Sequence, residues 1–234
     1  MKIVLVFLLM TIQSLYAVNY PVQLGDTQVM IHVERHGIGK SFIHLHQNET
    51  TALAAAKTMV DTQGGLLITL VHSGGRNIMF NLYNKHYEFD PNRIFTRLGI
   101  EKTLRQYSSY DPSAHKEIAK LAAAIKHLLP RGKIIAVHNN QQAYSLRSYL
   151  PGHRLAHDAQ DLRVLDQKNY RNFYLVTNPD DFKRLIQQQF NSVLQAKNAT
   201  DDGSLSIYLA NRDYVNVEAK FGQLLQQINM LHHA

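Results

Sequence analysis

Residues 42–60, FIHLHQNETTALAAAKTMV, predict an apolar strand, a polar turn and a helix in immediate succession. The apolar run ends at Leu45, and Thr50 and Thr51 can cap the alanine-rich helix that continues to Val60. Such a strand followed at once by a helix is the building unit of α/β folds. We therefore look for the same alternation on both sides of this stretch.

The alternation continues along the chain. Apolar runs predict strands at residues 29–33, 66–71, 134–137, 173–176, 204–209 and 214–217. Helical spacing of apolar residues predicts helices at 112–129, 182–194 and 224–231. With 234 residues and 45% hydrophobic residues, the chain suits one domain. We expect a single α/β domain whose mostly parallel or mixed central sheet is covered by helices on both faces.

The composition excludes several classes of site. The chain has no cysteine, which rules out disulfides, cysteine–zinc sites and a cysteine nucleophile. A metal site would have to use histidine and carboxylate, and the chain has 13 histidines. The net charge of +7 is dispersed along the chain, so we expect no nucleic-acid partner.

The N-terminus has the pattern of a signal peptide. Lys2 precedes the apolar run 3–10, and small and polar residues follow as far as Ala17. The run is too short to span a bilayer comfortably. We expect residues 1–17 to be removed, and residues 18–234 to act in the periplasm or outside the cell without a membrane span. A buried N-terminal strand is the alternative.

Two histidines and a glutamate, from two separate stretches of the chain, could together bind a metal ion. His46 and Glu49 stand three residues apart in the turn after a strand, where both can reach one small cation. His138 directly follows the strand 134–137, and sites in open α/β sheets form beyond the carboxyl ends of strands. Two imidazoles and a carboxylate suit zinc and leave one position open. A capping glutamate and a structural histidine are the alternative reading.

Two further features could act beside such a metal. Asn92 and Arg93, in DPNRIF at 90–95, offer hydrogen-bond donors that match a substrate carboxylate. Glu218 ends the last predicted strand, where a carboxylate can take up a proton and return it to a leaving amine. A surface salt bridge and a helix cap are the respective alternatives.

Taken in this order, these features resemble the M14 metallocarboxypeptidases, in particular their aspartoacylase and succinylglutamate desuccinylase branch. HQNE at 46–49 is similar to the H-G-N-E of that branch, with Gln47 in place of glycine, and DPNRIF is close to its D-L-N-R-I-F. The resemblance covers roughly residues 29–231. It implies that His46, Glu49 and His138 are zinc ligands. Asn92 and Arg93 would bind the substrate, and Glu218 would be the general acid/base.

The resemblance also implies a reaction. Residues 18–234 would form a zinc-dependent hydrolase domain, of carboxypeptidase or amidase type, that cleaves an amide or peptide bond next to a carboxylate-bearing residue. The aspartoacylase branch has an extra C-terminal β domain for which we expect no room here. Small cell-wall peptidases of this fold lack it too, so the expected substrates are small peptides or N-acyl amino acids, peptidoglycan-type peptides among them.

One position departs from the family pattern. The family uses an arginine upstream of Asn-Arg to polarise the scissile carbonyl, and Lys85 stands near that place. Arg76 is the chemical alternative, and both stay open. We expect further pocket residues on the polar segment 139–172.

Two other functions compete with this hypothesis. Arg35-His36-Gly37 follows a predicted strand and is similar to the R-H-G of histidine phosphatases, for which His138 could be the second histidine. Gln47 and the missing upstream arginine instead favour an exported binding module that has kept the zinc fold and lost turnover.

Overall fold

The computed structural model describes residues 15–140 and 144–234. The signal peptide that we expect at residues 1–17 therefore lies almost entirely outside the described residues. Residues 15–17 begin the first strand, β1 (Leu15–Leu24). Among the described residues, no helix has both the length and the apolar character that a membrane crossing needs.

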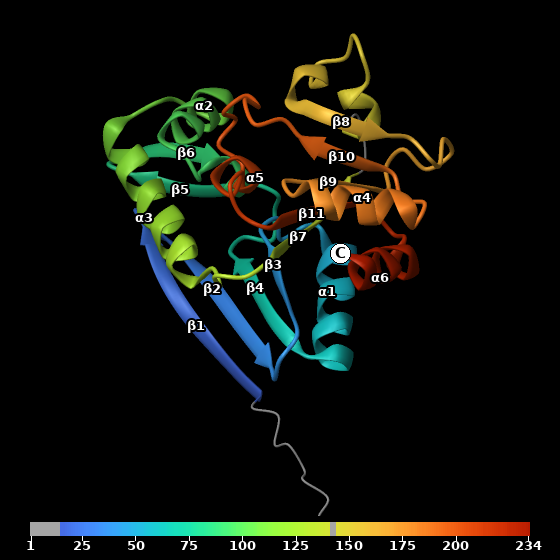
Figure 1. The fold of residues 1–234 in the computed structure, drawn as a ribbon. Coiled ribbons are helices and arrows are strands. Elements are labelled where there is room, and N and C mark those ends of the chain that lie inside the picture. Colours follow the sequence, from blue (N-terminus) through green and yellow to red (C-terminus); the bar gives the residue numbers. More distant parts are fainter. Residues whose placement is uncertain (1–14, 141–143) are drawn as a thin grey trace, which may run out of the picture.

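A nine-stranded mixed sheet forms the centre of the molecule, in the order β1-β2-β4-β3-β7-β11-β9-β10-β8 (Figure 1). After β1, its strands along the chain are β2 (Thr27–His36), β3 (Lys40–His44), β4 (Gly65–Val71), β7 (Ile134–Asn140), β8 (Ala159–Arg163), β9 (Phe173–Val176), β10 (Ser192–Gln195) and β11 (Tyr214–Lys220). The four central strands β4, β3, β7 and β11 are parallel. Their carboxyl ends consequently meet at one edge of the sheet.

Helices cover both faces of this sheet, as expected (Figure 1). The helices α1 (Thr50–Gln63), α4 (Pro179–Gln187) and α6 (Leu224–His233) pack on one face. The opposite face carries α2 (Arg97–Tyr107), α3 (Pro112–Leu128), the short α5 (Leu205–Tyr208) and a hairpin of β5 (Ile78–Leu82) and β6 (Lys85–Phe89). Three short 3-10 turns lie at Pro91–Arg93, Leu146–Tyr149 and Ala156–Asp158.

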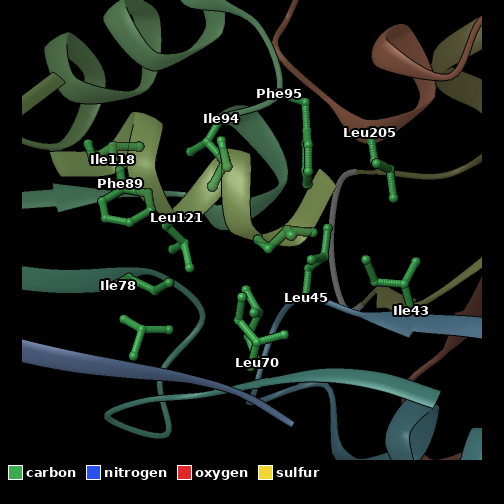
Figure 2. Close-up of a cluster of buried hydrophobic side chains, with 14 of the residues drawn as sticks. Ile43, Leu45, Leu70, Ile78, Phe89, Ile94, Phe95, Ile118, Leu121 and Leu205 are labelled. Carbon is green, nitrogen blue, oxygen red and sulfur yellow. The ribbon is translucent and has the colours of Figure 1, made fainter. Parts of the chain in front are cut away.

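Alternation along the strands divides most of the core into two large clusters, one on each face of the sheet, and a third, smaller cluster lies between β9, β10 and the 3-10 turn Leu146–Tyr149. In β3, Phe42 contacts the cluster under α1, α4 and α6, whereas Ile43 belongs to the cluster under α2 and α3. Successive side chains of a strand point to opposite faces, so each of the four central strands contributes to both large clusters. Figure 2 shows the second cluster, where Leu45 and Leu70 lie opposite Ile118 and Leu121 of α3. Because the two clusters share one sheet, they form a single domain.

Two predicted elements were wrong. Residues 204–209 are not a strand, because Leu205 and Leu209, four residues apart, are buried by α5 while Tyr208 is exposed. The predicted helix 182–194 ends at Gln187, and Gln189 then turns the chain with a φ of +65°. The residues that follow form β10, which pairs with β9 and β8.

Candidate metal centre

A cavity of about 740 Å³ opens at the edge where the central parallel strands end. His46 reaches it from the turn after β3, His138 from β7 and Glu218 from β11. In the parallel pairing of β7 and β11, Glu218 stands directly beside His138. The sheet itself thus brings together residues that are far apart in the sequence.

His46, Glu49 and His138 form a compact buried cluster. Glu49 Oε1 lies 3.0 Å from His46 Nδ1, and its Oε2 lies 3.0 Å from His138 Nδ1. The two Nδ1 atoms are 3.2 Å apart. At most 5% of each side chain is exposed. Among the described residues, these three form the group of histidine and acidic side chains that could hold a metal ion.

The donor set fits a divalent metal ion. Ligand atoms about 2.1 Å from one tetrahedral ion lie roughly 3.4 Å from each other, slightly more than the spacing found here. The backbone N–H of Asn139 donates to Glu49 Oε2 at 3.0 Å and helps to fix that carboxylate. His44, which lies behind the cluster, donates from Nε2 to the carbonyl of Glu49 at 3.1 Å. Burial lowers the pKa of His44 to about 4, so it stays neutral and structural.

Asp90 orients His46. Its Oδ1 lies 2.7 Å from His46 Nε2, so the ring donates there, and Nδ1 faces Glu49. Burial acts to lower the pKa of His46, but Glu49 and Asp90 outweigh it and raise that pKa to about 9. The site therefore favours a positive charge at this position. Asp90 also accepts from the backbone N–H of Asn92 at 2.7 Å, and so helps to orient the segment that carries Asn92 and Arg93.

The structure brings Arg76, but not Lys85, to the cluster. Arg76 donates from Nη1 to Glu49 Oε1 at 2.6 Å, and its Nη2 lies 3.5 Å from Asp90 Oδ2. Lys85 starts β6, is exposed and does not line the cavity. The β5–β6 hairpin, which the sequence did not reveal, carries Lys85 away from the cluster.

Asn92 and Arg93 line the same cavity from a 3-10 turn. The amide oxygen of Asn92 accepts from the backbone N–H of Leu205, the first residue of α5. Arg93 Nη1 donates to the carbonyl of Asn92 at 2.9 Å and lies 3.4 Å from Asp202 Oδ2. The Arg93 side chain is 36% exposed, so part of its guanidinium faces the cavity. Asp202 as a partner could not be foreseen from the sequence.

Glu218 is buried against two amides. Asn140 Nδ2 donates to its Oε2, and Asn216 Nδ2 donates to its Oε1, each at 3.2 Å. Burial raises the pKa of the Glu218 carboxyl more than the nearby His138 and the two asparagine amides lower it. The carboxyl group therefore keeps its proton to a higher pH than an ordinary glutamate does.

The segment 139–172 borders the cavity, as expected. Tyr144, Tyr149 and Arg154 line it, and the two tyrosine hydroxyls lie 2.7 Å apart. The sequence did not single out either tyrosine, because neither belongs to a recognisable motif.

The structure separates the histidines of the phosphatase alternative. His36 ends β2 and pairs with Gly65 at the amino end of β4, whereas His138 lies near the carboxyl end of β7. Because β4 and β7 run in the same direction, these histidines lie toward opposite edges of the sheet. His36 instead lies 3.4 Å from Asp61 of α1.

Comparisons with models of known protein families, with curated proteins and with solved structures find no match. A functional argument for this chain accordingly rests on its motifs and on the geometry of the cavity.

Proposed function

We propose that this chain is a zinc-dependent hydrolase that cleaves an amide or peptide bond next to a carboxylate-bearing residue. One observation carries the proposal: the buried cluster of His46, Glu49 and His138 shares a cavity with Arg93 and Glu218. A metal site, a group that can bind carboxylate and an acid/base are the parts that such a reaction needs.

His46, Glu49 and His138 would hold the zinc ion. Two histidines and one glutamate are a known ligand set of catalytic zinc sites, which keep a position open. The ion supplies Lewis-acid chemistry, polarising an oxygen atom of water or substrate. Asp90 keeps the Nδ1 atom of His46 free to coordinate, because it accepts the proton on Nε2.

Arg93 would bind the substrate carboxylate. Its planar guanidinium can donate two parallel hydrogen bonds to a carboxylate. Asp202, 3.4 Å away and 47% exposed, is a loose partner that leaves donors of Arg93 available. Asn92 lies next to it in the cavity wall.

Glu218 would move the proton. A buried carboxyl with a raised pKa can accept a proton from attacking water and deliver it to the leaving nitrogen. Glu49 cannot do this while its oxygens face a cation. Asn140 and Asn216 each hold one oxygen of Glu218 and so fix the direction of transfer.

Arg76 would stabilise negative charge on the carbonyl oxygen. Its guanidinium lies beside Glu49 and its side chain is 45% exposed, so it borders both the cluster and the open cavity. Donors fixed in advance at the place where charge develops are often the largest single contribution to catalysis.

The proposed substrates are small peptides and N-acyl amino acids, peptidoglycan-type peptides among them, encountered outside the cytoplasm. The deciding experiment incubates purified protein with stem peptides whose terminal carboxylate is free or amidated. We expect hydrolysis of the free acids, loss of activity with a chelator and recovery with zinc. Hydrolysis that resists chelation, or that is equal on amidated peptides, would contradict the proposal. Zinc binding without any hydrolysis would favour the binding-module alternative.

A further inference from the structure

The side chain of Gln47 ties down the loop that follows β4. Its Oε1 accepts from the backbone N–H of His72 at 2.7 Å and from that of Gly74 at 3.0 Å. Gln47 lies just beyond β3, and His72 directly follows β4, the parallel neighbour of β3. One carbonyl oxygen, using both lone pairs, thus bridges two adjacent strand ends.

Few other hydrogen bonds hold the backbone of this loop. Among the described residues, no backbone-to-backbone hydrogen bond outside the strands involves residues 72–76. Gly74 adopts a φ of +86° and is exposed. Without Gln47, two backbone N–H groups would lose their partner and the loop would gain conformational freedom.

This loop carries Arg76 to the metal cluster. The guanidinium of Arg76 reaches Glu49 and Asp90, but close to half of the side chain is exposed, so packing alone does not hold it. The path of the loop backbone decides where the guanidinium can lie. Gln47 holds the loop backbone two and four residues before Arg76.

We infer that Gln47 is a positioning residue that acts on the reaction through Arg76, by clamping the loop 72–76. Its consequence for turnover rests on the proposed hydrolase function. The motif that this chain resembles has glycine at this position, and glycine has no side chain to accept these hydrogen bonds. The glutamine thus gives this chain a contact that the H-G-N-E pattern lacks.

A first test needs no activity. Limited trypsin digestion of the full chain, read by mass spectrometry at the Arg76–Asn77 bond, reports how firmly the loop is held. We expect Gln47→Ala to be cut about 5-fold or more faster there, since two hydrogen bonds are lost. Gln47→Glu, which keeps an acceptor oxygen, should restore protection. Gln23→Ala, which removes a side-chain bond to Gly25 in a distant hairpin, should change nothing at this bond. Equal cleavage of Gln47→Ala and the parent chain would overturn the inference that Gln47 holds the loop in place.

A second test asks whether Gln47 acts through Arg76. We expect Gln47→Ala to lower kcat about 5-fold or more with little change in KM, and to have no further effect once Arg76→Ala is present. Losses that multiply in the double variant would overturn the inference while leaving the hydrolase proposal intact. If the parent chain hydrolyses nothing, the proposed function fails. The trypsin comparison still decides whether Gln47 holds the loop in place.

Discussion

Glu218 is the residue whose substitution tests the proposed proton transfer most clearly. Its carboxyl is buried between two asparagine amides and lies beside His138 without being part of the metal cluster. Glu218→Gln keeps the size, but it replaces one acceptor oxygen with an NH2 donor, so one of the two asparagine amides must turn over, and the side chain cannot transfer a proton. We predict that turnover falls about 10²-fold or more, while zinc affinity stays the same. Glu34→Gln, which removes a carboxylate of β2 that does not line the cavity, is the matched control.

Loss of zinc from Glu218→Gln would make this residue a ligand instead of an acid/base. Unchanged turnover would remove it from the mechanism.

A second prediction at the residue scale concerns Asp90. Asp90→Asn weakens the hydrogen bond that fixes the His46 ring, and an amide N–H turned toward Nε2 would shift the ring proton to Nδ1, where the metal must bind. We predict that zinc affinity falls about 10- to 100-fold, measured by competition with a chromophoric chelator. Asp158→Asn is the matched control, because Asp158 also pairs with a histidine, His157, at the cavity rim. Equal affinities in Asp90→Asn and the parent chain would contradict the role of Asp90.

At the scale of elements, α4 is anchored by one buried carboxylate. Asp181 Oδ1 accepts from Lys133 at 2.6 Å and from Arg184 at 2.9 Å. Burial acts to raise the pKa of Asp181, but Lys133 and Arg184 outweigh it and lower that pKa. Because the folded-state pKa is the lower one, this stabilisation is present above the unfolded pKa of about 3.9 and is lost as the pH falls below it.

Asp181→Asn tests this anchor. We predict that it lowers the free energy of unfolding by about 1–3 kcal/mol at pH 7, and that the difference shrinks as the pH falls from about 4 toward 2. Urea unfolding of both proteins across this range is the measurement. A difference that stays constant with pH would show that packing, not charge, anchors α4.

The elements that could be predicted from the sequence are those with a strong local signal. The apolar runs at 42–45 and 134–137 are strands, and parallel pairing of β3 with β7 is what brings His46 and His138 together. The β5–β6 hairpin was missed because its strands are short and partly polar, and this left Lys85 and Arg76 undecided. The start of α5 depends on Asn92, more than a hundred residues earlier, which a local pattern cannot reveal.

At the scale of the whole molecule, the topology brings charged side chains of both signs to one edge of the sheet. Four parallel strands end at one cavity, whose wall holds four basic side chains (Arg76, Arg93, Lys102 and Arg154) and four acidic ones (Glu49, Asp158, Asp202 and Glu218). With a net charge of +7, the molecule as a whole should attract anions, and the proposed carboxylate-bearing peptides would be among them.

We propose above all that His46, Glu49 and His138 bind one zinc ion in this cavity. The most direct measurement is an anomalous difference map at the zinc absorption edge from crystals grown with zinc. We predict one strong peak about 2.0–2.2 Å from Nδ1 of both histidines and from a carboxylate oxygen of Glu49. A map with no peak there, with the three side chains still bonded directly to one another, would contradict the account.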